Sequence, residues 1–252
     1  MGDIKKIKGI IMTYTINYIP VFYIGPNRDY ASYQEKFRTD PMFFAKKHVD
    51  FLNRCIDTPI KKATFVFNDD ISDELKVLAT EVASQIKTMD VEVVFRRNSG
   101  YSYGAWNDMI KKNLNEFDYF FLIEDDSIPL ETTFYEHFVE RCTPEYPFIS
   151  TFVDEYEPGK FCSSCPNSII RADICKKILA KYGELFLVNN STRLQDAWDT
   201  QMKFLNLFVD SGYGMRDILD KYSTPHNLNC NINDIRIFGD RTKPHNIVPI
   251  IP

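Results

Sequence analysis

The chain has 252 residues, of which 44% are hydrophobic and 26% are charged, a balance typical of a soluble globular protein with one large domain. Its net charge of -5 and the lack of a basic stripe argue against binding to a nucleic-acid backbone. No apolar run approaches the ~18 residues needed to cross a membrane, so we expect no transmembrane segment.

The amino terminus is basic and then apolar, like the start of a signal peptide. Its apolar part, KGIIMTY, is too short for that role and lacks a small-residue cleavage site. We therefore expect a cytoplasmic protein whose six cysteines are reduced thiols. We interpret residues 8–14 as the first strand, and the Tyr-, Pro- and Gly-rich residues 17–33 as a loop that could form one wall of a pocket.

Helix and strand signals then alternate through the first half of the chain. Asp40-Pro41 begins a helix on which His48 is expected to pack in the core, and Ser72 caps a second helix. Short apolar runs predict three further strands, at 63–67, 91–95 and 117–123, with a helix at 103–114 before the last of them. This alternation is typical of βαβ units in a Rossmann-like, mostly parallel sheet with flanking helices.

The second half continues with mixed signals. The sequence predicts a helix from 132 or 133 to about 142, helices at 171–182 and 193–208, and strands at 147–152 and 168–170. Periodicity is poor from Gly212 onward, and the chain has neither an internal repeat nor a low-complexity linker. A single α/β domain is therefore expected.

Three acids, Glu124, Asp125 and Asp126, directly follow the apolar run that ends at Ile123. A strand buried on both faces cannot carry three adjacent carboxylates within the core, so they must lie just past its end. Clustered carboxylates repel one another unless a cation lies between them, and Mg²⁺ or Mn²⁺ is the hard ion that suits them. The alternative is a solvated acidic turn.

Polar residues follow the other predicted strands as well. Thr13-Tyr14, Asp69-Asp70 and Arg96-Arg97-Asn98 each stand where a strand is expected to end. Because the carboxyl ends of parallel strands share one edge of a sheet, acids for a metal and arginines for phosphates would meet there. This convergence favours the metal site over the solvated turn.

In their order and spacing, the pieces IIMTY, FVFNDDISDE, RRNSGYSYGAWN and FLIEDDSIP resemble the GT-A glycosyltransferases, especially family-2-like members. FLIEDDSIP corresponds to the DXD motif of that family in a Glu-Asp-Asp form. The resemblance implies a single GT-A domain over residues 1–252. Residues 7–130 would form the nucleotide-sugar-binding half, and residues 131–252 the acceptor-binding half with a C-terminal lid.

The resemblance also implies roles for single residues. Asp126 would bind the metal directly, with Mn²⁺ expected, or Mg²⁺. Asp69 would contact the base of the donor, flanked by Thr13 and Tyr14. Arg97 or Asn98 would lie near the phosphates or the ribose, and Glu124 and Asp125 would hold the ribose or a metal-bound water. The full donor-binding set is Thr13, Tyr14, Asp69, Arg97, Asn98, Glu124 and Asp125.

A base for the acceptor hydroxyl is expected if the reaction inverts the sugar. The resemblance points to Gln195-Asp196, where the family often has Glu-Asp, with Asp199 one helical turn further on. The alternative for Asp196 is an acid favoured by the dipole at a helix start. A late histidine, His245 or His226, would supply a further metal ligand.

These assignments predict an enzyme that moves a sugar from a nucleoside-diphosphate sugar, with UDP as the expected nucleotide, to a hydroxyl of a glycan or glycoconjugate. A sugar-nucleotide nucleotidyltransferase is one alternative. It would need a Gly-rich, basic loop after the first strand; the sequence there reads TYTINYIP, with no glycine, which argues against this alternative. A non-catalytic nucleotide- or sugar-binding module is the other.

Overall fold

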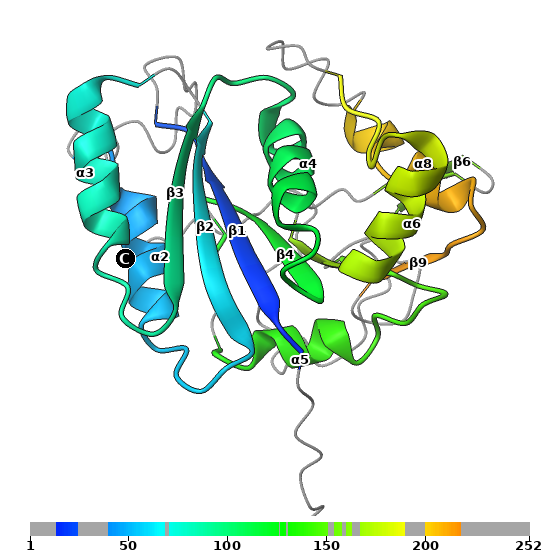
Figure 1. The fold of residues 1–252 in the computed structure, drawn as a ribbon, viewed down its shortest axis with the longest axis horizontal. Coiled ribbons are helices and arrows are strands. Elements are labelled where there is room, and N and C mark those ends of the chain that lie inside the picture. Colours follow the sequence, from blue (N-terminus) through cyan, green and yellow to red (C-terminus); the bar gives the residue numbers. More distant parts are fainter. Residues whose placement is uncertain are drawn as a thin grey trace, which may run out of the picture.

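A seven-stranded sheet forms the centre of the protein (Figure 1), in the order β3-β2-β1-β4-β8-β5-β9. The computed structural model describes residues 14–24, 40–68, 71–125, 127–129, 131–150, 154–157, 160–162, 167–189 and 200–217. The strands of this sheet are β1 Ile16–Phe22, β2 Ile60–Asn68, β3 Asp90–Arg96, β4 Tyr119–Glu124, β5 Phe148–Ser150, β8 Ser168–Arg171 and β9 Met215–Asp217.

The described residues also form six helices and a small two-stranded sheet, which pairs β6 Asp154–Glu157 with β7 Lys160–Cys162. The helices are α2 Phe43–Leu52, α3 Asp73–Ala83, α4 Tyr101–Asn113, α5 Phe134–Val139, α6 Ala172–Tyr182 and α8 Asn206–Val209. Within the described part of the chain, no helix has the length and apolar character needed to cross a membrane.

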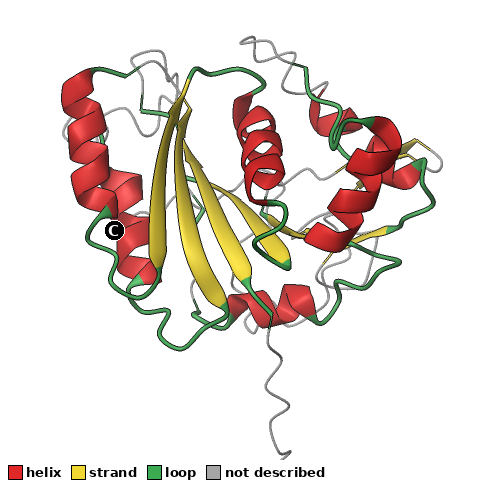
Figure 2. Cartoon of the chain, in the orientation of Figure 1, coloured by secondary structure: helices red, strands yellow, loops and turns green. Residues whose placement is uncertain are grey.

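Helices cover both faces of the sheet and make three layers (Figure 2). Side chains of α2, α3 and α5 pack on one face, and those of α4, α6 and α8 pack on the other. Successive strand residues point to opposite faces, so β4 places Phe121 and Ile123 in the first core and Phe120 and Leu122 in the second. The prediction of an α/β fold with a mostly parallel sheet and flanking helices is confirmed.

The first strand of the described chain lies later than the sequence analysis expected. Residues 17–22, predicted as loop, belong to β1, while residues 8–13 lie outside the described part. The loop was predicted because residues 17–33 are rich in Tyr, Pro and Gly. Asn17 is nevertheless fully buried, and its side-chain oxygen accepts a hydrogen bond of 3.0 Å from the Thr64 hydroxyl. The Trp106 indole N–H donates to the carbonyl of Ile19, the residue before Pro20, at 3.2 Å.

The other elements of the first half lie close to their predicted places. The Ser72 hydroxyl caps α3 by accepting from the Leu75 N–H at 3.4 Å, as the sequence predicted. His48 on α2 is fully buried, also as predicted. In the second half, β8 runs antiparallel to β4 and β5, which the sequence did not reveal.

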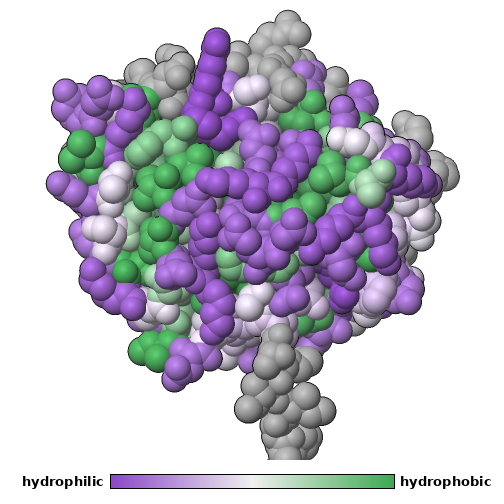
Figure 3. Space-filling model, in the orientation of Figure 1, coloured by the Kyte–Doolittle hydropathy of each residue, from purple (hydrophilic) through white to green (hydrophobic). Residues whose placement is uncertain are grey.

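β3 is an outer strand, and all of its residues remain at least partly exposed. On the face shown in Figure 3, hydrophobic side chains gather in separate patches between hydrophilic ones. Glu92 of β3 pairs with Lys62 at 2.6 Å and also contacts Lys112. Charged groups on an outer strand discourage pairing with the strands of other chains, so this edge is protected.

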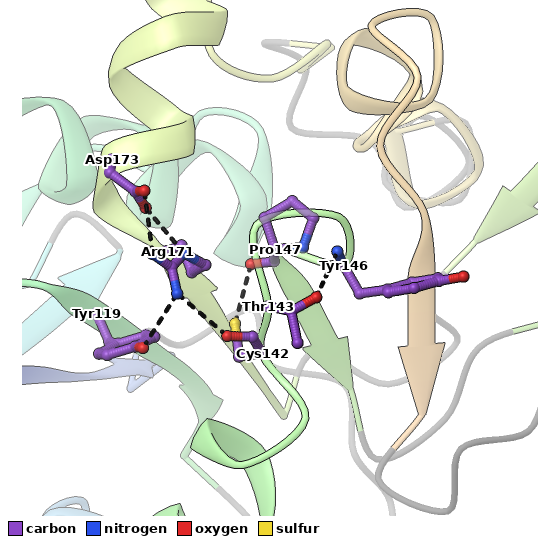
Figure 4. Close-up of polar contacts among 7 residues, drawn as sticks. All are labelled: Tyr119, Cys142, Thr143, Tyr146, Pro147, Arg171 and Asp173. Carbon is purple, nitrogen blue, oxygen red and sulfur yellow. Dashed lines mark hydrogen bonds and ion pairs between the residues drawn. The ribbon is translucent and has the colours of Figure 1, made fainter.

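Arg171, at the end of β8, ties several segments together near the start of β4 (Figure 4). Its guanidinium donates to both carboxylate oxygens of Asp173, at 2.9 and 3.0 Å. It also donates to the Cys142 carbonyl at 3.3 Å and to the Tyr119 hydroxyl at 3.4 Å. Burial raises the pKa of Asp173, but the hydrogen bonds and charge of Arg171 outweigh it and leave this pKa below its ordinary value.

We expect Arg171→Ala to lower the free energy of unfolding by about 2–3 kcal/mol, because hydrogen bonds to charged groups contribute this much. Lys176→Ala, which removes an exposed charge from the same helix as Asp173, should change it by about 0.5 kcal/mol or less. The folded pKa of Asp173 lies below the unfolded one, so its contribution is present at neutral pH and is lost as the pH falls below about 4. Urea unfolding at pH 7 and pH 3 checks both points. Equal losses in the two variants, or a loss that is the same at both pH values, would contradict this role for Arg171.

Candidate active site

The topology of the sheet singles out one place for a ligand. From β1 the chain adds β2 and then β3 on one side, and it returns to place β4 on the other side of β1. β1 is parallel to both β2 and β4, so their carboxyl ends meet at one edge. In open α/β sheets, ligands bind outside the carboxyl ends of the strands where the strand order reverses in this way. Here that point lies between Phe22 and Glu124.

At this point Asp125 bridges the two strands. It begins the turn after β4 and is only 2% exposed. The N–H of Tyr23, the residue after β1, donates to its Oδ2 at 3.2 Å. A buried carboxylate needs such donors to offset the loss of water, so the link to β1 both holds the acid and stabilises it.

A chain of hydrogen bonds runs beside Asp125 and ends at Glu124. The Ser102 hydroxyl donates to Glu124 Oε1 at 3.0 Å, so the Tyr23 hydroxyl, 3.0 Å from the Ser102 oxygen, is the donor to Ser102. The Asn68 amide in turn donates to the Tyr23 oxygen at 3.1 Å. Burial raises the pKa of Tyr23 well above its ordinary value, which keeps its proton in place. Three strand ends and the start of α4 thus supply aligned polar groups.

The turn after β3 extends this polar edge. Arg96 donates to the side-chain oxygen of Asn68 and, at 3.1 Å, to the Ser99 carbonyl, and it forms an ion pair of 3.0 Å with Asp108. Its charge is therefore engaged within the protein. Asn98 accepts from the Asn68 amide at 3.2 Å, and Arg97 is exposed. Of the basic residues in this turn, Arg97 is the one presented to solvent.

A hollow of about 240 Å³ lies beyond the start of α4, lined by Glu184, Leu187, Val188, Asn189, Thr200 and Lys203. The N–H of Asn189 donates to the Thr200 hydroxyl at 2.9 Å. The wall reaches Gly100, because a Cβ placed there would lie 2.5 Å from Val188 Cγ1 and 3.3 Å from the Asn189 carbonyl oxygen. The hollow therefore borders the turn that carries Arg97 and Asn98.

Gly100 should be much less tolerant of a side chain than Gly183. Both have a left-handed backbone, with φ of +74° and +73°, but nothing lies within 4 Å of a Cβ at Gly183. We expect Gly183→Ala to cost about 1 kcal/mol from backbone strain alone. Gly100→Ala adds the clash with Val188, for a total of about 2–4 kcal/mol. Urea unfolding of the two variants measures the difference, and equal losses would show that the wall yields without cost.

The structure places the predicted site residues unequally. Glu124 and Asp125 lie together at the switch point, and Asn98 reaches the same network through Asn68. The placement of Tyr14 at the end of the first strand is wrong. It precedes β1, and its ring meets that of Tyr119, the first residue of β4, with centroids 5.6 Å apart. Six predicted site residues lie outside the described part: Thr13, Asp69, Asp126, Asp196, Asp199 and His245.

The side chains at this edge suit a hard divalent cation in kind, because they offer carboxylate oxygens. Among the described residues, however, no three His, Cys, Asp or Glu side chains form a group that could hold a metal ion. Asp126, predicted as the direct ligand, and both candidate histidines, His226 and His245, lie outside those residues. The metal site therefore stays a prediction.

Sequence reasoning missed the part played by Tyr23, Ser102 and His48. Tyr23 fell in the stretch interpreted as a loop, although that stretch was also considered as a pocket wall. Ser102 fell within the SGYSYG turn, where it showed no distinguishing pattern. His48 Nε2 lies 3.0 Å from the Asp125 carbonyl oxygen, a contact that spans 77 residues. From the sequence, the apolar face of its helix indicated that His48 is packed in the core, but not that it contacts Asp125.

No protein-family model matches the sequence, and a search of curated proteins finds no match. Several solved structures match this chain at low sequence identity. A 4-diphosphocytidyl-2C-methyl-D-erythritol synthase from Anaerococcus prevotii is 8% identical, with 76% of this chain and 85% of that chain covered and a TM-score of 0.45.

Two longer chains match as well. The mannosyltransferase PcManGT from Pyrobaculum calidifontis, in complex with GDP-Man and Mn²⁺, is 11% identical over 70% of this chain and 48% of that chain, with a TM-score of 0.46. S. aureus TarS 1-349 is 12% identical over 76% and 56%, with a TM-score of 0.42. This chain spans about half the length of these two. Because these sequence identities and TM-scores are low, no residue role is transferred from these proteins to this chain.

Proposed function

We propose that this chain is a GT-A-type glycosyltransferase. It would move a sugar from a nucleoside-diphosphate sugar, with UDP as the expected nucleotide, to a hydroxyl of a glycan or glycoconjugate. The observation that carries the proposal is the pair of carboxylates, Glu124 and Asp125, held at the point where the strand order reverses. Asp126 follows them directly, and Asp69 follows the end of the neighbouring strand β2.

Each group would have a distinct task. Asp126, with His245 or His226, would hold Mn²⁺ or Mg²⁺, an ion that neutralises the charge growing on a departing diphosphate. Asp69 would contact the base of the donor. Arg97, which is exposed in the turn after β3, would bind phosphate, and Asn98, which accepts a hydrogen bond from Asn68, would bind ribose.

The acceptor side of the reaction falls to the second half of the chain. Asp196, with Asp199 next in line, would take the proton from the attacking hydroxyl. Asp196 and Asp199 lie in sequence between Asn189 and Thr200. Asn189 and Thr200 are hydrogen-bonded to each other, and both line the hollow. This anchoring supports the assignment because it ties both ends of the segment beside the start of α4.

The alternative of a nucleotidyltransferase is stronger than the sequence alone suggested. It was disfavoured because TYTINYIP, taken to follow the first strand, has no glycine. That argument is wrong, because β1 ends at Phe22 and the residues that follow it are YIGPNRDY. In the sequence, Gly25 and Arg28 come shortly after this strand, and an enzyme of this class would use glycine and a basic residue there for the triphosphate. An enzyme of this class would take a nucleoside triphosphate and a sugar phosphate.

A thermal-shift panel separates the two functions. UDP-, GDP- and CDP-sugars are compared with nucleoside triphosphates, each with Mn²⁺ and with EDTA. A ligand at a hundredfold excess over its Kd adds ~2.7 kcal/mol of stability, which is about 5–10 °C in Tm for a chain of this size. A glycosyltransferase should respond to one nucleotide sugar, and only with Mn²⁺. A response to a triphosphate alone would favour the nucleotidyltransferase, and no response to any nucleotide would contradict both functions.

A further inference from the structure

The acidic turn after β4 is closed by a backbone hydrogen bond in which the Ser127 N–H donates to the Glu124 carbonyl at 3.1 Å. Asp125 lies in this turn, directly after Glu124, the last residue of β4. The protein holds Asp125 at two points, since its side chain accepts from the Tyr23 N–H and its carbonyl oxygen lies 3.0 Å from His48 Nε2. The second contact fixes the carbonyl group of Asp125.

The proton positions in this contact follow from the chemistry of the partners. A carbonyl oxygen only accepts, so His48 Nε2 carries the hydrogen and donates to Asp125. Burial lowers the pKa of His48 to about 4, so the ring is neutral at pH 7 and its other nitrogen, Nδ1, is an acceptor. The Tyr18 hydroxyl, 3.0 Å from Nδ1, is therefore its donor. The order is Tyr18 O–H to His48, and His48 N–H to Asp125.

The surroundings leave this arrangement little freedom. His48 and Tyr18 are both fully buried, on α2 and β1 respectively. The ring of Phe22 meets the His48 ring edge-on with centroids 5.3 Å apart, and Tyr18 stacks on Phe121 of β4 at 5.8 Å. The imidazole therefore cannot turn away without disturbing the core, and the direction of its N–H is set.

We propose that Tyr18 and His48 act as a positioning pair, which holds the backbone of Asp125 so that the carboxylates of Glu124 and Asp125 stay in place for a nucleotide donor and its divalent cation. This inference rests on the proposed function for its consequence, although the holding of the turn stands on the contacts above. The physical gain is preorganisation, because a turn already fixed loses less conformational freedom when a ligand binds. Neither residue touches the substrate in this proposal.

Three variants test the pair. Tyr18→Phe keeps the stacked ring but removes the donor to His48. His48→Leu removes both hydrogen bonds, and His48→Gln restores an N–H for Asp125 and an acceptor for Tyr18. The matched control is Thr64→Val, which removes one hydroxyl from another buried hydrogen bond of the same sheet, the one to Asn17.

Two quantities are measured in the folded proteins: the amide hydrogen-exchange rate of Ser127 without metal, and the Kd for Mn²⁺ in the presence of UDP. Tyr18→Phe should raise both about tenfold, and His48→Leu up to about a hundredfold, the range found when partners that orient metal ligands are lost. His48→Gln should recover most of the loss. Thr64→Val should change neither, although it destabilises the protein by a similar amount to Tyr18→Phe.

Values for Tyr18→Phe and His48→Leu that match those of Thr64→Val would overturn the proposal, since the pair would then be ordinary core. Should His48→Leu fail to fold, Tyr18→Phe against Thr64→Val still decides. A wild-type chain that binds no Mn²⁺ with any nucleotide would refute the proposed function instead, and the Ser127 exchange rates would then decide whether the pair holds the turn.

Discussion

Asp126→Asn is expected to abolish Mn²⁺-dependent nucleotide binding. Asparagine has nearly the same shape as aspartate but lacks its charge, and hard cations depend on charged oxygen ligands. The loss should reach at least about a hundredfold in Kd, more than the 10–100-fold that follows the loss of residues that only support a ligand. Calorimetry with UDP and the UDP-sugar, with Mn²⁺ and with EDTA, measures it.

A suitable control is Asp118→Asn, just before the other end of the same strand. Asp118 accepts from the N–H and the hydroxyl of Thr15, at 2.8 and 2.9 Å, at the edge where β4 begins. It should affect stability but leave binding unchanged. Unaltered UDP affinity with Mn²⁺ in Asp126→Asn would remove this residue from the metal site, and Glu124 and Asp125 would then be the acids to test.

The strand that leads to these acids could be predicted well from the sequence. The run from Phe117 to Ile123 is too apolar to lie anywhere but between two layers, and β4 indeed occupies Tyr119–Glu124 with residues 120–123 fully buried or nearly so. The burial cost of carboxylates then places the acids at its carboxyl end. Burial patterns of this kind are local properties, so a single sequence is enough to reveal them.

β1 could not be predicted in the same way. Its buried Asn17 is tolerated because Thr64, 47 residues away, supplies a hydrogen bond, and its Pro20 lies in a central strand where proline is disfavoured. Both features depend on neighbours that are distant in the chain. Because of this error, the edge of the site was expected at Tyr14 and not at Tyr23. The argument against a nucleotidyltransferase was then based on the wrong residues.

The hydrogen-bond network shows the same limit. Tyr23 meets Asp125 across 102 residues and Ser102 across 79, and each of these residue types is common in loops. Nothing in their local pattern distinguishes them, whereas the direction of a strand and the facing turn bring them together. The sequence therefore predicted where the acids lie, and the fold identified what holds them.

Asp196→Asn is expected to leave nucleotide binding intact and to slow sugar transfer by about 10²–10⁴-fold, the usual contribution of a general base. The amide keeps the size and polarity of the carboxylate but cannot take the proton of the attacking hydroxyl. Binding should survive because the donor is held by the strand ends, where Glu124 and Asp125 lie, and not by the segment between Asn189 and Thr200.

Asp199→Asn is the matched comparison, because the two acids stand three residues apart in one predicted helix and differ only in position. Transfer is measured at saturating donor, so that kcat reports the chemical step rather than binding. If Asp196→Asn keeps full turnover and Asp199→Asn does not, the base is Asp199. Full turnover in both, with binding unchanged, would place the base outside this helix or indicate a retaining reaction, which needs no such base.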